Sequence, residues 1–341
     1  MREGVYMNLG RFDLPGLSLR ESLYSQWGRL NRRHARTCHT AIRYKQFKKM
    51  KIAIIGASGE VGFRLVKKLC NDHQIKCIVR NKNKKDFRSL KNIEVVVVKD
   101  VSETTDLTSA IEGTDVIINT GYIWFAEDIN NAIKALDKHP KQIIFTGSTG
   151  IFTKLQSNGA QLKRDAELFI QKNYKIPWTI IRPTMIYGHI NDRNISRLTK
   201  VINKTPIFPL IGRGNSLIQP VFIDDLLKAF EIAILNEHVF RKSFNIGAEK
   251  PISNKHLFQS VAVALKKKIF LVSINPKIIS LTLKILALLK IRPISQEQIL
   301  RFQEDKNISL EEFQKSFNFT PISFEKGIES LIIDMKTKKC L

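Results

Sequence analysis

The segment at residues 51–62, KIAIIGASGEVG, constrains the fold more than any other part of the chain. It joins a short apolar run to three closely spaced glycines, and an apolar-periodic stretch follows from Val61 to Leu69. A strand that is covered on both faces is apolar throughout, whereas a helix repeats its apolar positions every three to four residues. The segment therefore predicts a buried parallel strand, a tight turn and a helix.

The three glycines are expected to have separate roles in a dinucleotide-binding turn. Gly56 takes a positive φ, Gly59 lets the backbone approach a pyrophosphate, and Gly62 lets the helix pack closely on the strand. The N–H groups at the start of the helix then face the anion. Because the triplet follows a strand and opens a helix, it favours dinucleotide binding over an ordinary glycine-rich turn.

Apolar segments of strand length recur along the chain with helical segments between them. Strands that alternate with helices predict an α/β fold, a Rossmann-type doubly wound parallel sheet with its ligand at the carboxyl ends of the strands. The strands after the first are expected at residues 75–80, 93–99, 115–119, 143–146, 178–182 and 244–246. Helices are expected at 104–112, 225–235, 254–265, 276–289, 296–301 and 324–335, and residues 194–202 are expected to start the substrate-facing lobe.

Two helix starts carry polar side chains that suit a capping role. We expect Ser102 or Thr104 to cap the helix at 104–112. Asp224 and Asp225 have the form of a catalytic carboxylate pair, but at a helix start we expect them to act as caps and dipole partners.

The chain divides into three regions. Residues 1–49 form a basic N-terminal extension with 8 Arg and 3 Lys against 3 acidic residues. Residues 50–250 form the dinucleotide-binding domain, of which 186–220 contribute to a substrate lobe, and residues 251–341 form a smaller, mainly helical C-terminal lobe. The extension has no apolar core of a secretory signal, and we expect it to be dispensable. An organelle transit peptide, or upstream sequence before a start at Met50, are the alternatives.

Composition excludes several classes of protein. With 341 residues and 43% hydrophobic content, the chain can bury a full core. The net charge of +25 comes from lysines scattered through the chain, without an aromatic-interleaved basic module, so no nucleic-acid partner is expected. The 4 cysteines show neither a metal spacing nor a disulfide framework, so we expect no metal and a cytoplasmic location, with an organelle as the alternative.

The end of the second expected strand bears on cofactor choice. An acidic residue there would bind the ribose hydroxyls of NAD, whereas Arg80 would meet the 2′-phosphate of NADP. NADP is therefore favoured, and NAD stays possible. The alternative is that Arg80, with Lys82, Lys84 and Lys85 nearby, belongs to a solvated basic loop.

Several later motifs carry a family resemblance. They are Asn119-Thr120-Gly121, a serine after the fifth strand, and the segments at 180–188 (IIRPTMIYG), 219–226 (QPVFIDDL) and 244–247 (FNIG). Together with the glycine-rich turn, Arg80 and Asp100-Val101, they resemble the short-chain dehydrogenase/reductase superfamily, in its extended and atypical NAD-dependent epimerase/dehydratase branches. The similarity covers most of residues 50–330.

The resemblance implies roles for the positions that match. The phosphate loop comprises Gly56, Ser58, Gly59, Glu60, Val61 and Gly62. The adenine side takes Arg80, Asp100 and Val101, the ribose and nicotinamide side takes Asn119, Thr120 and Gly121, and the nicotinamide borders Pro183 and Thr184. The catalytic pair would be Ser148, which holds the substrate oxygen, and Lys163, which also binds the nicotinamide ribose; the alternative for Ser148 is an ordinary turn serine.

Two positions depart from the family pattern. The family tyrosine stands four residues before the lysine, so that both side chains share a helix face, but here that residue is Gly159. Tyr122, Tyr187 or His189 are candidate substitutes, although Tyr187 is expected to be structural. Sugar-nucleotide enzymes place a pyrophosphate-clamping arginine where this chain has Ile218, which weakens the case for a nucleotide-sugar substrate.

The most apolar stretch begins at Ile278 and ends at Ile291, and it includes Lys284 and Lys290. It is too short for a bilayer, which needs about 20 residues. A buried helix is the default, and contact with a membrane surface or a protein complex is the alternative. The sequence around this stretch is similar to the tail of the nucleotide-binding accessory subunit of respiratory complex I and its bacterial relatives.

Two functional hypotheses follow. The first is an NADP(H)-dependent oxidoreductase or epimerase that acts on a small carbonyl or hydroxyl compound. The second is a non-catalytic NADP-binding assembly or sensor protein, because the tyrosine position is Gly159.

Overall fold

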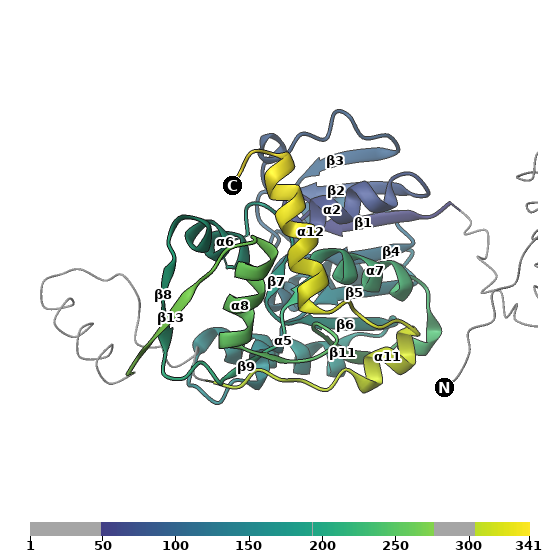
Figure 1. Ribbon diagram of the computed structural model, residues 1–341. Helices are drawn as coiled ribbons and strands as arrows, with labels where there is room; N and C mark the ends of the chain where they lie inside the picture. Colours follow the sequence, from purple (N-terminus) through teal and green to yellow (C-terminus); the bar gives the residue numbers. More distant parts are fainter. Residues whose placement is uncertain (1–48, 193, 276–303) are drawn as a thin grey trace, which may run out of the picture. The chain divides into compact units, whose positions relative to one another are not determined.

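Seven parallel strands form the central sheet of this protein, in the order β11-β6-β5-β4-β1-β2-β3 (Figure 1). The computed structural model describes residues 49–192, 194–275 and 304–341, which belong to one compact unit that begins at Lys49. The strands are β1 (Lys51–Ile55), β2 (Gln74–Val79), β3 (Ile93–Val97), β4 (Val116–Asn119), β5 (Gln142–Thr146), β6 (Trp178–Pro183) and β11 (Lys242–Ile246). The predicted doubly wound parallel sheet is confirmed.

The apolar runs form the centre of this sheet because both of its faces are covered. In β1, Ile52, Ala53 and Ile54 are fully buried. β1 pairs in parallel with β2 on one side and with β4 on the other, so the chain reverses its winding direction beside β1. Ligands of doubly wound sheets bind at the carboxyl edge of such a switch point.

Helices cover the two faces and bury separate cores. One face carries α2 (Glu60–Leu69), α7 (Ile223–Ala233) and α11 (Glu311–Phe317), and the other carries α3 (Thr104–Ile111), α4 (Ala126–Lys134) and α5 (Asn158–Asn173). α11 follows residue 250 in the chain, yet its Phe317 ring packs edge-on against Phe244 of β11, with 5.0 Å between the ring centroids.

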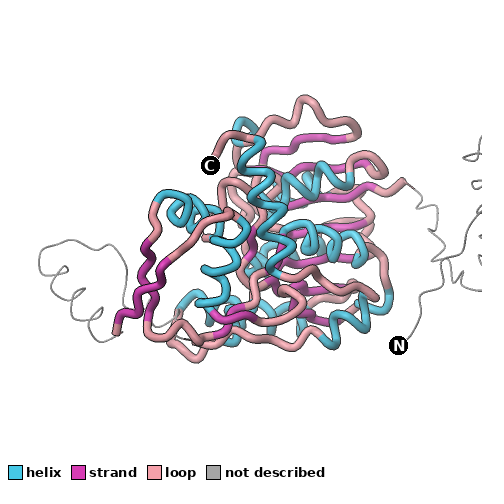
Figure 2. Tube along the Cα trace, viewed as in Figure 1, coloured by secondary structure: helices cyan, strands magenta, loops and turns pink. Residues whose placement is uncertain are grey.

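A third core belongs to the lobe around α6 (Ile195–Lys204), α8 (Asn254–Ala264) and α12 (Phe324–Thr337). Three two-stranded sheets accompany it, and the strands of the longest one stand at the left of Figure 2. They pair β7 (Ile186–Tyr187) with β10 (Val221–Phe222), β9 (Leu217–Ile218) with β12 (Ile252–Ser253), and β8 (Ile207–Ile211) with β13 (Phe270–Ile274). Short 3-10 turns span Lys82–Lys84, Ile123–Phe125, Thr149–Phe152 and Glu237–Val239.

The capping predictions were wrong, although Asp224 and Asp225 do lie in the first turn of α7, as expected of partners of the helix dipole. The N-cap of α3 is Glu103, and no side chain hydrogen-bonds there. α7 begins at Ile223 with Phe222 as its N-cap, and the Asp225 carboxylate instead accepts a hydrogen bond from the Ile322 N–H at 2.9 Å. Asp225 thus ties the C-terminal tail to α7, which the local sequence does not reveal.

Part of the expected C-terminal lobe lies outside the described residues, including the helices predicted at 276–289 and 296–301. The helix predicted at 324–335 is confirmed as α12, and that at 254–265 as α8. β12 and β13 were not predicted, and each pairs with a strand that precedes residue 250. Within the residues that the structure describes, no helix has the length and apolarity to cross a membrane.

Candidate functional site

The glycine-rich turn joins β1 to α2 in the strained geometry that its sequence predicts. Gly56 has φ of +79°, a conformation that residues with a Cβ rarely adopt. A Cβ on Gly62 would lie 2.4 Å from the Gly56 carbonyl oxygen and 2.6 Å from Thr120 Oγ1. α2 starts with Gly59 as its N-cap and without a side-chain cap. Its first N–H groups therefore remain available to an anion at the carboxyl edge of the sheet.

The end of β4 closes this turn from the other side. Thr120 Oγ1 donates to the Ile55 carbonyl at 2.9 Å, which fastens β4 to the end of β1. Asn119 is fully buried; its Oδ1 accepts from the Gly121 N–H at 3.0 Å, and its Nδ2 donates to the Tyr122 carbonyl at 3.2 Å. The structure thus brings residues 119–121 against the glycine-rich turn.

Arg80 and Asp100 lie at the ends of β2 and β3 on the same edge. Arg80 is exposed directly after β2. The pKa of Asp100 is lowered by hydrogen bonds from Ser102 and, to a smaller extent, by the positive charge of Arg80. Val101 beside it is buried. These two ionic side chains are therefore near neighbours at the edge where the second nucleotide-binding strand ends.

Ser148 and Lys163 both lie near Gly150, beyond the end of β5. A Cβ on Gly150 would lie 3.1 Å from Ser148 Oγ and 3.8 Å from Lys163 Nζ, so both polar groups border the same point. Ser148 Oγ accepts the Gly150 N–H at 3.1 Å, which fixes the turn. The serine therefore fixes the turn, and the lysine lies in its neighbourhood.

A buried ion pair supports the helix that carries Lys163. Arg182 of β6 donates through Nε to Glu167 Oε1 at 2.9 Å, and its Nη2 also contacts that carboxylate. The two side chains are only 14% and 5% exposed. Glu167 lies one helical turn after Lys163, so this pair fixes α5 against the sheet at the site.

Pro183 and Thr184 lie where β6 ends. The Thr184 N–H donates to the Ile246 carbonyl at 3.0 Å, and its hydroxyl donates to the Gln219 carbonyl. Thr149 Oγ1 donates to the Pro183 carbonyl at 3.4 Å, which connects this segment to the Ser148 turn.

The candidate substitutes for the family tyrosine lie in different surroundings. Tyr187 is buried, its hydroxyl donates to the Phe324 carbonyl at 3.3 Å, and burial raises its pKa far above the usual range. This places Tyr187 in the packing of the third core. Tyr122 is 56% exposed and stacks on Trp124. Neither geometry identifies a proton donor beside Ser148.

Gly159 occupies an open position in the first turn of α5. A Cβ there would find Ser157 Oγ at 4.0 Å as its nearest neighbour. The missing tyrosine is therefore not a consequence of crowding, because the backbone at this position has room for a side chain.

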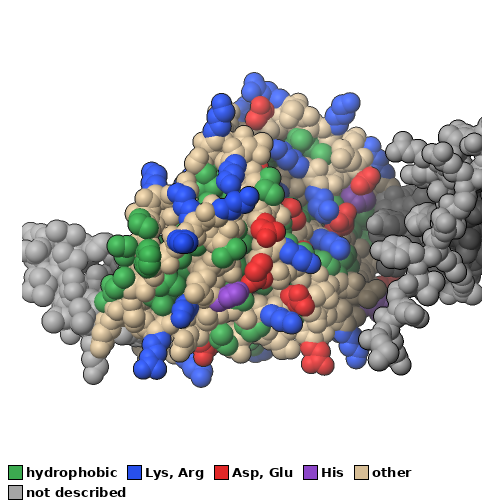
Figure 3. Space-filling model, in the orientation of Figure 1, with side chains coloured by type: hydrophobic (Ala, Val, Ile, Leu, Met, Phe, Trp, Pro, Cys, Tyr) green, Lys and Arg blue, Asp and Glu red, His purple; other side chains and the backbone are tan. Residues whose placement is uncertain are grey.

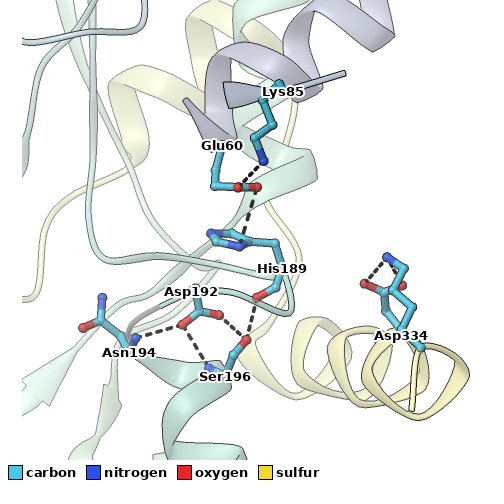
Figure 4. Close-up of polar contacts among 8 residues, drawn as sticks. Glu60, Lys85, His189, Asp192, Asn194, Ser196 and Asp334 are labelled. Carbon is cyan, nitrogen blue, oxygen red and sulfur yellow. Dashed lines mark hydrogen bonds and ion pairs between the residues drawn. The ribbon is translucent and has the colours of Figure 1, made fainter. Parts of the chain in front are cut away.

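Sequence reasoning missed an ionic cluster at the start of α2, which Figure 4 shows in close-up. The Glu60 carboxylate accepts a hydrogen bond from Lys85 Nζ at 2.5 Å and lies 3.9 Å from His189 Nδ1. Burial opposes ionisation of Glu60, but the hydrogen bond and charge of Lys85 outweigh it and lower the pKa of the carboxyl. Burial lowers the pKa of His189. Lys85 and His189 lie 25 and 129 positions after Glu60 in the chain, so only the fold reveals these contacts.

The site as a whole defines a class of protein. An uncapped helix N-terminus, a glycine turn with positive φ and a switch point beside β1 together form a dinucleotide-binding edge of a Rossmann domain. A family model described as NAD(P)H-binding matches residues 56–205.

Three curated proteins are similar to this chain in sequence. A 4-epimerase of N-acetyl-α-D-glucosaminyl-diphospho-ditrans,octacis-undecaprenol from Escherichia coli O157:H7 is 25% identical over 249 residues, 64% of this chain and 73% of the relative. UDP-glucose 4-epimerase of Vibrio cholerae is 24% identical over 254 residues, 63% of this chain and 76% of the relative. A 41 kDa chloroplast stem-loop binding protein of Arabidopsis thaliana is 25% identical over 63% of each chain.

Solved structures agree on the fold. UDP-glucose 4-epimerase of Thermotoga maritima covers 85% of this chain and 100% of its own, with a TM-score of 0.66 and 13% identity. The dTDP-glucose 4,6-dehydratase of Bacillus anthracis, in complex with NAD, covers 85% and 97% with a TM-score of 0.64 and 16% identity. The chain thus contains an NAD(P)H-binding region at residues 56–205 and is similar to NAD-dependent epimerases and dehydratases in sequence and in fold. The resemblance of its tail to a complex I subunit is not confirmed.

Proposed function

We propose that this protein is an NAD(P)-dependent oxidoreductase or epimerase that acts on a hydroxyl or carbonyl carbon of a small compound. The observation that carries the proposal is that Ser148 Oγ and Lys163 Nζ both lie close to Gly150, at the edge of the sheet that also carries the glycine-rich turn. The nicotinamide would supply the hydride acceptor and donor. Ser148 would hold the substrate oxygen, and Lys163 would orient the ribose and stabilise negative charge on that oxygen.

The chain's own groups fit a bound dinucleotide. The turn from Gly56 to Gly62 and the first N–H groups of α2 would hold the pyrophosphate, since α2 has no side-chain cap. Asp100 and Val101 would border the adenine, and Asn119, Thr120 and Gly121 the ribose and nicotinamide. Pro183 and Thr184 would present backbone to the nicotinamide ring.

NADP is the cofactor that the charge distribution favours. Arg80 is exposed at the end of β2, where the nucleotide ribose is bound in this fold, and its guanidinium suits a 2′-phosphate. Lys82 would add a weaker, screened attraction.

Two observations guide the choice of substrate. Two of the three named relatives are epimerases, one of UDP-glucose and one of an N-acetylglucosaminyl group on undecaprenol diphosphate. Ile218 stands where sugar-nucleotide enzymes have their clamping arginine, which argues against a nucleotide carrier. We therefore place hydroxyl compounds without a nucleotide, sugars among them, first in a substrate screen.

A non-catalytic NADP-binding assembly or sensor protein is the second candidate. Gly159 favours it, since the helix position that supplies the family's proton donor carries no side chain although space is available.

A turnover screen separates the two candidates. Purified protein is incubated with NADPH or NADH and carbonyl compounds, and with hydroxyl compounds for epimer exchange. Under the first candidate, Lys163→Ala lowers kcat by about 10² or more, since a positioned charge that assists proton transfer contributes on this scale. Lys172→Ala, a change of an exposed lysine on the same helix, serves as the matched control and leaves kcat unchanged. Cofactor binding by calorimetry without turnover on any compound would instead support the second candidate.

The proposal extends to the binding partners of the protein and to its compartment. We propose a small-molecule substrate and no nucleic-acid partner, and a membrane or protein-complex contact through Ile278 to Ile291, residues outside those that the structure describes. We propose a cytoplasmic location; the chloroplast name of one relative keeps an organelle as the alternative. A fluorescent reporter fused after residues 1–49 distinguishes them by its location in the cell.

A further inference from the structure

The small parallel sheet of β8 and β13 presents an apolar face to the outside. Ile207 is 60% exposed, Phe270 66% and Val272 50%. Phe270 pairs with Ile207 in the register, and Val272 pairs with the exposed Pro209, so these four side chains form one continuous face. We call it the β8–β13 face, and Figure 3 shows hydrophobic side chains gathered there, at the left of the molecule.

The opposite side of the same sheet packs against the lobe, so the β8–β13 face points away from the lobe. Leu210 is buried, and the Phe208 ring packs against Phe258 of α8 with 4.8 Å between the ring centroids. Side chains alternate across a strand, so a sheet with one covered face normally carries polar residues on the other. Here the outer positions are apolar as well. An exposed apolar patch of this kind marks an interaction surface rather than a requirement of the fold.

Basic side chains border the β8–β13 face at both ends. The exposed Lys204, Lys267 and Lys268 lie where the two strands begin: Lys267 Nζ donates to the Asn203 carbonyl, and the Phe270 N–H donates to the Pro206 carbonyl at 2.7 Å. At the other end, β13 is tied to the turn that carries the exposed Arg213. There the Gly212 N–H donates to the Ile274 carbonyl at 2.8 Å.

The two chain segments that build this region contain no acidic residue. Residues 194–223 hold four Lys or Arg, residues 250–275 hold five, and neither segment has an Asp or Glu. The rest of the chain holds all 31 acidic residues, so the basic side chains of these two segments have no acidic residue within their own segment to offset them. His256 of α8 pairs with Glu325 of α12, 2.8 Å away.

We propose that the β8–β13 face is a docking surface for an anionic lipid bilayer. Aliphatic and aromatic side chains that enter the boundary between headgroups and acyl chains gain hydrophobic free energy, and each lysine near an anionic membrane adds an electrostatic attraction. An apolar centre with a basic border fits this partner. A nucleic acid would instead need exposed aromatic rings for stacking among its phosphate contacts, whereas this face has one ring and three aliphatic side chains.

This surface is separate from the Ser148–Lys163 site. Its four apolar residues are Ile207, Pro209, Phe270 and Val272, so it shares no residue with the apolar stretch between Ile278 and Ile291. The proposal does not depend on the proposed activity, and either can fail without the other. If both hold, the protein acts on its substrate at a membrane surface.

The test is co-sedimentation of the full chain with vesicles of phosphatidylcholine, with and without phosphatidylglycerol. We expect binding to the anionic vesicles that weakens with added salt, and weak binding to phosphatidylcholine alone. The variant Ile207→Ser/Phe270→Ser removes the apolar centre and is expected to weaken binding about tenfold or more, given the transfer free energy of such side chains. Ile333→Ser is the matched control, because Ile333 on α12 is also 66% exposed, and it leaves binding unchanged.

A second pair of variants tests the basic border. Lys204→Gln/Lys268→Gln is expected to lower the affinity for anionic vesicles about tenfold and to reduce its salt dependence. The control variant Lys315→Gln/Lys336→Gln changes two exposed lysines of α11 and α12. It is expected to leave the affinity for anionic vesicles and its salt dependence unchanged. Cofactor binding and Tm, measured on every variant, confirm that the protein is folded.

Several outcomes overturn the proposal. Absence of vesicle binding in the wild type does so, and equal binding by the wild type and Ile207→Ser/Phe270→Ser places any membrane contact elsewhere, residues 276–303 included. A concentration-dependent dimer that the same variant abolishes, without vesicle binding, assigns the face to a second copy of the chain. Salt-dependent binding of a stem-loop RNA without vesicle binding assigns the basic border to nucleic acid.

Discussion

At the scale of single residues, Gly62 and Gly159 show how different the constraints on two glycines can be. A Cβ on Gly62 would lie within 2.6 Å of both the Gly56 carbonyl and Thr120 Oγ1, whereas a Cβ on Gly159 meets nothing closer than 4.0 Å. We expect Gly62→Ala to lower the free energy of unfolding by about 1–3 kcal/mol, because α2 must move away from β1 and β4. Gly159→Ala is the matched control and raises it by about 0.5 kcal/mol, since alanine favours the helix. Urea unfolding measures both.

The same open position permits a gain of function. Gly159→Tyr places a phenol one helical turn before Lys163, on the same face of α5. If the protein is an enzyme that lacks its usual proton donor, kcat rises by about 10², the scale of general acid catalysis. Gly159→Phe adds the ring without the hydroxyl and leaves kcat unchanged. An equal rise in both variants would show that packing, not proton transfer, causes the effect.

At the scale of elements, His189 connects the loop after β7 to the start of α2. Burial lowers the pKa of its ring, although Glu60 and Asp192 raise it and Arg64 and Lys85 lower it slightly. At pH values just below 6.5, the ordinary pKa of histidine, His189 is therefore protonated more in the unfolded chain than in the folded chain. The free energy of unfolding falls as pH drops through this window, by at most about 1.4 kcal/mol per pH unit for this residue.

We expect His189→Gln to flatten the dependence of stability on pH between about 5 and 6.5. Glu60 does not interfere, because its pKa is lowered below 4.5. His73 also has a pKa lowered by burial, so part of the slope remains in the variant. Urea unfolding at several pH values measures the slope, and the exposed His139 gives the control His139→Gln. An unchanged slope in His189→Gln would mean that this histidine titrates as it does in the unfolded chain.

The elements that the sequence predicts are those whose local pattern of apolar residues reflects their burial in the fold. β1 and β4 are buried on both faces, so each consists of an almost unbroken apolar run that predicts a strand. β8 and β13 were missed because each is held by a partner about 60 residues away, and Pro209 lies within β8. The two-residue strands β7, β9, β10 and β12 exist only through such pairing. Caps failed for a similar reason: Asp225 bonds to a distant tail rather than to its own helix.

For the candidate site, local conformation was predictable and long-range partnership was not. The positive φ of Gly56 follows from the glycine spacing. The contacts of Glu60 with Lys85 and His189 depend on how three segments pack, and no spacing in the chain encodes them. The proximity of Arg80 and Asp100 was predictable in part, because the parallel strands β2 and β3, which precede them, end at the same edge of the sheet.

At the scale of the whole molecule, cofactor binding and folding are linked. A ligand that binds only the folded chain stabilises it by RT ln(1 + [L]/Kd), about 2.7 kcal/mol at a hundredfold excess over Kd. Every group proposed to hold the dinucleotide lies in the unit that begins at Lys49, so the cofactor should raise the Tm of that whole unit.

The size of the rise distinguishes the two cofactors. A charge-assisted bond from Arg80 to the 2′-phosphate contributes about 1.5–3 kcal/mol, which corresponds to an affinity for NADP about 10 to 150 times that for NAD. At equal concentrations, NADP should therefore raise the Tm of the wild type more than NAD does, whereas Arg80→Ala should bring the two shifts together by lowering that of NADP. Lys91→Ala, a change of an exposed lysine after the second strand, preserves the difference. Calorimetric titration gives the two Kd values directly, and equal values in the wild type would reject the role of Arg80.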